Sequence, residues 1–237
     1  RGDGGDGGGG GNGSVGGEGG RSGIFTAAVC AALPPRLQSV RMGSTAITGM
    51  LPPCLFTSTL RELQVQENKL YGALPPLPAG SPMRIMVFDN QTGDAASLTT
   101  GGGNALGAPP QLGLTGSIPG SYAMAPQLTL FSASRNSLSG QLPSFDQQTL
   151  NVLRLNDNVL KGTVPASLSG LPALDALDLS HNALSGTLPD DILSGANMRD
   201  VSFRDNSLTG WVPGAKLGKF VRYVDLSENL LSGEALP

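Results

Sequence analysis

Several residue types are scarce in this sequence, and each scarcity excludes a class of protein. The 237 residues include one histidine, two cysteines, 5% aromatic and 14% charged residues, with a formal net charge of −3. This charge gives no electrostatic basis for binding nucleic acid or an acidic membrane. No apolar run approaches the roughly 20 residues that a membrane-spanning helix needs. We therefore expect no nucleic-acid partner and no direct membrane insertion within this chain.

The two cysteines, Cys30 and Cys54, are too few for a disulfide framework. They are consistent with one pair or with two small buried side chains, and the second alternative is favoured. Glycine and proline are abundant instead, with 35 and 18 residues, which indicates many turns. Residues 1–23 are mostly glycine with almost nothing apolar to offset backbone entropy, so we expect a disordered tail or linker there.

From Leu37 onward the template LxxLxLxxNxLxGxxP recurs eight times. Adjacent copies are offset by 22 to 24 residues with one exception, and they start at Leu37, Leu60, Met83, Leu128, Leu150, Leu174, Met198 and Val221. The exception is an insertion at about residues 92–111, which separates "MRIMVFDNQ" from "LGLTGSIP" in the third copy. A fixed period of this length predicts stacked coils, each burying its apolar face against its neighbours.

The form NxLxGxIP, as in "NALSGTLP" and "NKLYGALP", resembles the plant-type leucine-rich repeats of receptor ectodomains. The resemblance covers about residues 37–237. It implies an α/β horseshoe solenoid with a concave parallel β-sheet, short second strands, and short helical or 3₁₀ turns on the convex side. We expect a leucine-rich-repeat domain at residues 24–237, of about eight repeats and truncated at its C-terminal end.

The fixed letters of the repeat build the scaffold. Leu153 and Leu155 are two residues apart, so both point to the interior of a strand-based coil. The Asn158 amide has both donors and an acceptor, which suit the backbone groups left where the chain turns out of the strand. We expect a structural asparagine ladder formed by Asn68, Asn136, Asn158, Asn182, Asn206 and Asn229.

The varying letters between the leucines face out of the concave sheet and are the candidate ligand-binding residues. They are Arg135, Arg154, Asp157, Asp178, His181, Arg204, Asp205, Tyr223 and Asp225. Trp211, in "LTGWVP", is a candidate interface anchor on the flank, and packing near Phe220 or Tyr223 is the equal alternative.

No residue set predicts catalysis, a metal site or a cofactor. His181 lies five strand steps from both cysteines, about 24 Å in a stacked solenoid, which separates any Cys/His pair. We expect a non-catalytic scaffold that binds a protein or peptide on its concave face, as part of a receptor-like ectodomain.

Two alternatives remain: an intracellular adaptor of the cytoskeleton or ciliary axoneme, and a regulatory segment of a larger receptor-like kinase. The receptor interpretation places the chain outside the cell or on a membrane-anchored ectodomain; the adaptor would be cytoplasmic. The sequons at Asn12 and Asn90 are glycosylation acceptors only in a secreted chain. A terminal cap with a cysteine pair around "WxGVxC" is not present, since "GIFTAAVC" has neither the tryptophan nor the first cysteine.

Overall fold

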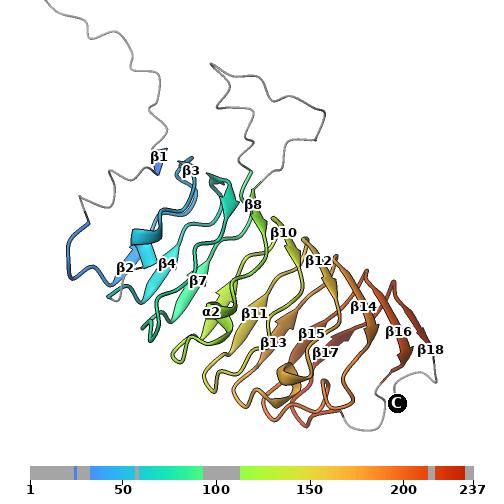
Figure 1. Ribbon diagram of the computed structural model, residues 1–237. Coiled ribbons are helices and arrows are strands. Elements are labelled where there is room, and N and C mark those ends of the chain that lie inside the picture. The colour runs from blue at the N-terminus through green and yellow to red at the C-terminus, as the bar shows by residue number, and fades with distance from the viewer. Residues whose placement is uncertain (1–23, 26–32, 57–58, 93–112, 213–216, 233–237) are drawn as a thin grey trace, which may run out of the picture.

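The structure is a computed structural model that describes residues 24–25, 33–56, 59–92, 113–212 and 217–232. In the described residues the chain winds into successive coils that stack side by side along one axis (Figure 1). Every strand pair is parallel, and each coil contributes one strand to a first sheet and a second strand to another sheet. The predicted parallel solenoid is confirmed, with little helix.

The first sheet holds eight described strands, one from each repeat. In spatial order they are β2 (Ser39–Arg41), β4 (Glu62–Gln64), β7 (Ile85–Val87), β9 (Leu130–Ser132), β11 (Val152–Arg154), β13 (Ala176–Asp178), β15 (Asp200–Ser202) and β17 (Tyr223–Asp225). The register aligns equivalent repeat positions, so Leu153 lies between Phe131 and Leu177. β7 pairs directly with β9, although the predicted insertion, most of which lies outside the described residues, separates them in the sequence.

The second sheet is built by the "LxGxxP" segments. Its described strands are β6 (Gly72–Ala73), β8 (Leu114–Gly116), β10 (Ser137–Gly140), β12 (Val159–Gly162), β14 (Ala183–Thr187), β16 (Ser207–Trp211) and β18 (Leu230–Ser232). At the N-terminal end a smaller sheet is formed by β1 (Ile24–Phe25), β3 (Thr48–Gly49) and β5 (Lys69–Leu70).

Short helical turns follow some of the second strands. They are the 3₁₀ turns η1 (Pro53–Phe56) and η3 (Ala166–Gly170) and the single α-helical turn α2 (Gly120–Ala123). A proline stands immediately before α2 and before η3, where its fixed φ suits the start of a turn. The expected short helical and 3₁₀ turns are thus present.

The core runs through the middle of the coils. Leu153 and Leu155 are fully buried, and Arg154 between them is exposed, as the alternation of a strand requires. Phe131 packs with its ring centroid 5.3 Å from that of Tyr122 and 6.5 Å from that of Phe88. The Tyr122 hydroxyl donates to the Pro75 carbonyl at 2.9 Å, and burial raises the pKa of this phenol.

Asparagine side chains join each coil to the one before it. The Asn158 Nδ2 group donates to the carbonyl of Leu155 in its own coil at 3.0 Å and to that of Ala133 in the preceding coil at 2.9 Å. Its Oδ1 accepts from the Leu138 N–H at 2.9 Å. Each amide therefore bonds backbone, rather than the next asparagine. Asn68, Asn182 and Asn206 make the equivalent bonds.

Asn136 and Asn229 complete the same pattern in their coils. In the third coil a glutamine takes the asparagine position. Gln91 Nε2 donates to the Val65 carbonyl at 2.8 Å, and its Oε1 accepts from the Leu70 N–H at 3.2 Å. The longer side chain reaches the same backbone groups, so the bridge between coils continues through this repeat.

Cys54 corrects one expectation. It is disulfide-bonded, whereas the small number of cysteines favoured unpaired thiols. The sequence holds one other cysteine, Cys30, which lies outside the described residues. A count of cysteines gives no information on which residues the fold brings within bonding distance, so this pairing could not be read from composition.

Candidate functional site

The outward side of the first sheet carries two rows of side chains. In the first seven strands the middle residue is buried, and its two neighbours lie on the other side of the strand, as with Val152 and Arg154 around Leu153. In β17 the middle residue, Val224, is partly buried. The row of Arg154 was predicted. Of the row that contains Val152, only Tyr223 was predicted. The same alternation around each buried middle residue would have identified the whole row. Its members are Ser39, Glu62, Ile85, Leu130, Val152, Ala176, Asp200 and Tyr223.

Four neighbouring positions of this second row form an apolar stripe across β7, β9, β11 and β13. The stripe consists of Ile85, Leu130, Val152 and Ala176, all half-buried. Register places them side by side, Ile85 against Leu130 and Val152 against Leu130 and Ala176. At about 4.8 Å per strand, the stripe is about 14 Å long. Charged residues border it at both ends, Glu62 on β4 and Asp200 on β15.

Five predicted residues lie just beyond the strands of the first sheet: Arg135, Asp157, His181, Arg204 and Asp205. Arg135, Asp157, His181 and Asp205 follow the strands in left-handed turns with φ between 52° and 56°, and so they form a rim rather than a part of the sheet. Several of these side chains contact a partner in the neighbouring coil. His181 Nδ1 is 2.8 Å from Asp205 Oδ2, Arg135 Nε is 3.8 Å from Asp157 Oδ2, and Arg204 Nη2 is 2.5 Å from Glu228 Oε1.

On the sheet itself, Arg154 and Asp178 lie in register on β11 and β13. Asp178 Oδ1 accepts from both the backbone N–H and the hydroxyl of Ser180, at 3.1 Å and 2.6 Å. The Arg154 guanidinium is exposed and has no hydrogen-bond or ion-pair partner among the described residues. It is therefore a cation that a ligand can contact without breaking a protein ion pair.

Tyr223 and Asp225 lie at the C-terminal end of the sheet. The Tyr223 hydroxyl donates to Asp225 Oδ2 at 3.1 Å, while Asp225 Oδ1 accepts from the hydroxyl of Ser227 at 2.6 Å and from its N–H. The Ser227 hydroxyl bond lowers the pKa of Asp225, with further help from the Ser227 N–H and Tyr223. The hydrogen bond to Asp225 raises the pKa of Tyr223, and the negative charge of Asp178 adds to this.

The N-terminal end of the sheet carries an ion pair that sequence reasoning missed. Arg41 Nε and Nη2 donate to the two carboxylate oxygens of Glu62, at 2.8 Å and 2.9 Å. The hydrogen bond from Arg41 lowers the pKa of Glu62, and a hydroxyl bond from Ser39 at 2.9 Å contributes. The Glu62 charge is therefore already satisfied within the protein, unlike that of Arg154.

The remaining predicted residues lie away from the concave sheet. Trp211 is 75% exposed at the end of β16 on the second sheet, so it does not pack inside a repeat. Asn90 is half-buried in a left-handed turn with φ 53°, and its neighbour Gln91 is the buried bridge between coils. Asn12 falls outside the described residues.

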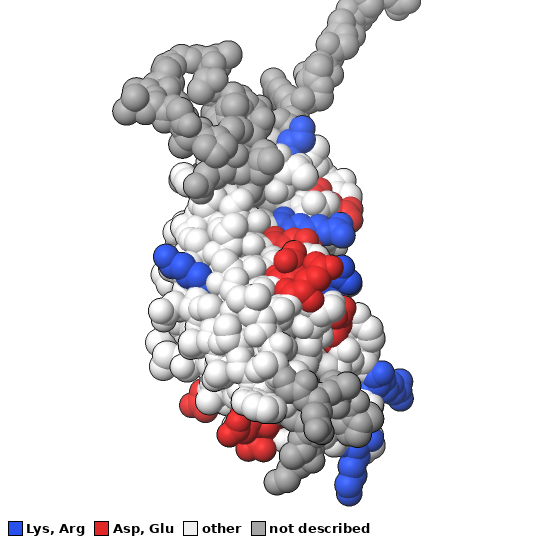
Figure 2. Space-filling view, turned by 90° about the vertical axis from the view of Figure 1, so that its right-hand side faces the viewer, with Lys and Arg blue, Asp and Glu red and all other residues white. Residues whose placement is uncertain are grey.

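Figure 2 shows the side of the molecule that lies at the right in Figure 1. Acidic and basic side chains gather there in a band, and a broad neighbouring area carries few charges. Within the described part of the chain, no cluster of three or more His, Cys, Asp or Glu residues is placed to hold a metal ion. None of the described helices has the length and apolar character to cross a membrane.

Comparison with known proteins identifies the repeat. Residues 128–184 match the family model described as leucine rich repeat. The receptor-like kinase TMK2 of Arabidopsis thaliana is 28% identical over 212 residues, which are 84% of this chain and 24% of that protein. The chain thus spans about a quarter of the length of this relative.

Two solved plant receptors show the same architecture. The ectodomain of GASSHO1/SCHENGEN3 from Arabidopsis thaliana, in complex with CASPARIAN STRIP INTEGRITY FACTOR 2, is 25% identical with a TM-score of 0.66, covering 84% of this chain and 25% of that one. The Arabidopsis receptor kinase HAESA, in complex with the peptide hormone IDA and the co-receptor SERK1, is 22% identical with a TM-score of 0.70. The match covers 84% of this chain and 31% of that one. The likeness to HAESA concerns the fold alone.

Together the stacked parallel coils, the inward leucines and the bridging amides define a repeat solenoid with an open concave sheet. The "NxLxGxxP" segments pair into a second sheet. Residues 128–184 are leucine-rich repeats, and the repeats along the chain are similar to those of a plant receptor-like kinase.

Proposed function

We propose that this chain is a non-catalytic recognition scaffold that binds a protein or peptide across the apolar stripe of its first sheet. One observation carries the proposal: the stripe of Ile85, Leu130, Val152 and Ala176 is open on a sheet whose charged neighbours include the exposed Arg154. An apolar patch bordered by a few polar groups is the usual composition of a binding surface.

The geometry favours an extended segment. The stripe of about 14 Å matches about four residues of extended chain. Backbone groups inside the sheet are already bonded to neighbouring strands, so a ligand lying across the sheet is recognised by side chains and not by strand addition. The rim charges are paired with one another, which leaves the stripe and its open neighbours as the selective part of the surface.

The likeness to plant receptors supports a place in a receptor-like ectodomain. The relative TMK2 is a receptor-like kinase, and the GASSHO1/SCHENGEN3 ectodomain was solved with a bound factor. The disulfide bond of Cys54 also suits an oxidising compartment, outside the cell or on a membrane-anchored protein. Within a receptor-like kinase, this segment would sense the ligand and regulate the rest of the protein.

The test uses the whole chain and a random heptapeptide library displayed on phage. We expect enriched peptides to lose binding to a Val152→Glu variant, since it places a charge at the centre of the stripe. They should keep binding to Ser185→Glu, which adds the same charge on the exposed second sheet. Equal thermal unfolding of both variants shows that the fold is intact. Enriched peptides that bind Val152→Glu normally, or no enrichment at all, would contradict the proposal.

A further inference from the structure

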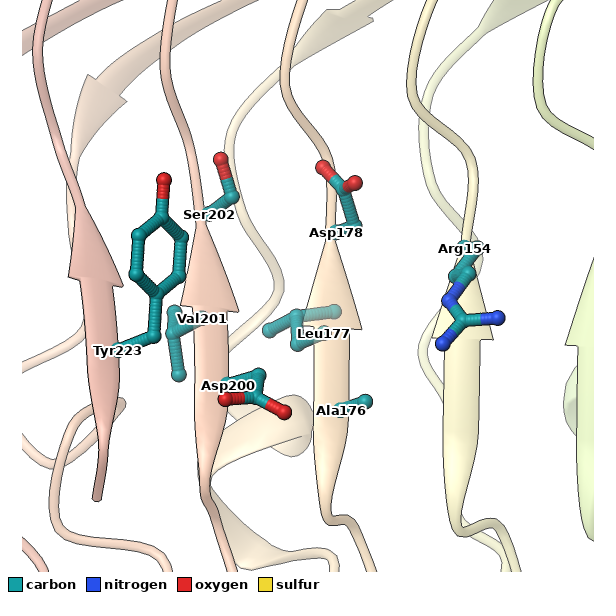
Figure 3. A pocket seen from close by; sticks show the side chains of 8 residues that line it. All are labelled: Arg154, Ala176, Leu177, Asp178, Asp200, Val201, Ser202 and Tyr223. Carbon is teal, nitrogen blue, oxygen red and sulfur yellow. The ribbon is translucent and has the colours of Figure 1, made fainter.

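A shallow hollow of about 190 Å³ lies at the C-terminal end of the apolar stripe (Figure 3). It opens above Ala176, because this side chain is the smallest among the neighbours Val152, Ala176 and Asp200 in the same row. Three adjacent strands, β11, β13 and β15, and Tyr223 of β17 surround it. The hollow therefore exists only because side chains from four coils meet there.

The hollow is lined by both apolar and polar side chains, and two of the polar ones are carboxylates. Figure 3 shows the Asp200 carboxylate extending from β15 towards β13 and Ala176. Asp200 is exposed, and its carboxylate has no hydrogen-bond or ion-pair partner among the described residues. Asp178 stands on the other row, and its Oδ2 is left free because Ser180 occupies only Oδ1. Both acids thus offer unused acceptor oxygens to the same small space.

An aromatic ring forms one side of this space. Tyr223 aligns with Asp200 in the register of β15 and β17, and its side chain is 53% exposed. Its hydroxyl is held by Asp225, which fixes the ring upright beside Ser202. A ring face next to carboxylates attracts a cation through both its quadrupole and the neighbouring negative charge.

We propose that the hollow receives the Lys or Arg side chain of a peptide ligand, with Asp200 and Asp178 accepting its hydrogen bonds and Tyr223 contacting its stem. This assignment rests on the proposed function and names the ligand class for one end of the stripe. The methylenes of such a side chain cover Ala176, while the charged head lies between the two acids.

The charges along the sheet also set the direction of the ligand. Arg154, on β11, lines the side of the hollow opposite β15. Its charge repels a basic head group from that side towards the two acids, and its guanidinium offers a partner for a carboxylate or carbonyl of the ligand. At the opposite end, a second hollow of about 420 Å³ is lined by Arg61 and Arg84, and the acid there, Glu62, is already bonded to Arg41. A basic residue is therefore directed to the end formed by β13 and β15.

The test starts from peptides selected on the wild-type chain from the same heptapeptide library. We expect Lys or Arg to be enriched at one position, next to apolar residues. Synthetic peptides should lose affinity by about tenfold or more for an Asp178→Asn and Asp200→Asn double variant, because a charge-assisted contact is removed. The same loss is expected for Ala176→Leu, which fills the hollow with a side chain that β9 already carries at the equivalent position.

Two controls make the result specific. Asp190→Asn combined with Asp191→Asn, two exposed acids after β14, removes the same charge outside the concave sheet and should leave affinity unchanged. A peptide with citrulline in place of arginine should bind wild type as weakly as arginine binds the double variant, and should lose nothing further on that variant.

The outcomes separate the two proposals. Peptides that lose binding to Val152→Glu but show no basic enrichment, or that bind the Asp178/Asp200 and Ala176 variants normally, overturn the basic pocket and leave the stripe as a binding surface. Peptides that are insensitive to Val152→Glu overturn both. Equal binding of the citrulline peptide to the wild-type chain also overturns the basic pocket.

Discussion

The two long sheets are made by the same coils, yet they present different surfaces. Strands of the first sheet carry six charged residues in the described part of the chain: Arg41, Glu62, Arg154, Asp178, Asp200 and Asp225. Described strands of the second sheet carry one, Lys161, among serines, threonines and glycines. The two sheets therefore share a backbone period but differ in function. They differ because their outward side chains contact different things.

Outward residues of the second sheet have a packing role. Gly186 has φ +80°, and a Cβ there would lie 2.9 Å from the Thr163 Cγ2 of the preceding coil. The same arrangement recurs between Gly210 and Thr187 at 2.7 Å. The residue after each glycine thus covers the glycine of the next coil. This contact leaves little room for a larger residue at the glycine position. Outward residues on the strands of the first sheet do not pack over such a glycine, so they can differ between repeats and recognise a ligand.

The largest expected effect comes from the bridges that join the coils beneath the first sheet. Asn158→Ala leaves the Leu138 N–H and the carbonyls of Ala133 and Leu155 without these partners, and the free energy of unfolding should fall by about 1–3 kcal/mol. Urea denaturation measures this. Gln148→Ala removes an exposed side-chain amide just before the same repeat; it is the control and should change stability by about 0.5 kcal/mol or less. Similar losses for both would refute the bridging role.

A smaller effect is expected from replacing a glycine of the second sheet, where both the positive φ and the close contact with the preceding coil oppose a larger residue. Gly186→Ala should cost about 1–2 kcal/mol, because a residue with a Cβ is strained at positive φ and approaches Thr163. Adding Thr163→Ala should restore the stability that is lost through the contact with Thr163. The loss that comes from backbone strain at positive φ should remain. Thermal unfolding of the single and double variants provides the measurement. Full recovery in the double variant would show that φ contributes nothing, and no recovery would show that the contact is harmless.

The smallest effect concerns the paired charge on the first sheet. The pKa of Glu62 is lowered by Arg41, so its stabilisation is present above pH 4.5, the ordinary pKa of a glutamate, and is lost as the pH falls through the lowered value. In Arg41→Ala this part of the acid sensitivity should disappear, and unfolding free energy should decline less steeply below pH 4.5. Denaturation curves from pH 6 to about pH 3 test it. Parallel pH profiles for both proteins would contradict the assignment.

Much of the fold could be predicted because the repeat fixes it locally. Leu153 and Leu155 are buried for the same reason that Arg154 is exposed, namely the alternation of side chains along a strand. The asparagine position was found because its column is so regular. That Gln91 serves in the same role was not foreseen, since it depends on whether one more methylene still reaches the carbonyl of Val65.

The candidate site was only partly foreseen. The row that contains Val152 and Ala176 obeys the same alternation and was overlooked. The turn positions of Arg135 and His181 were placed on the sheet, but their left-handed backbone moves them to the rim. A sequence column does not show where a strand ends, because that depends on the hydrogen bonds to the neighbouring coil.

The sequence by itself determined which side chains point inward and which point outward, because alternation is a property of the covalent chain. Only the tertiary structure decided which outward charges are satisfied. Arg41 meets Glu62 across coils, while Arg154 and Asp200 remain open beside the gap above Ala176. The reason is that these contacts depend on the rotamers of long side chains from separate coils, which no single repeat contains.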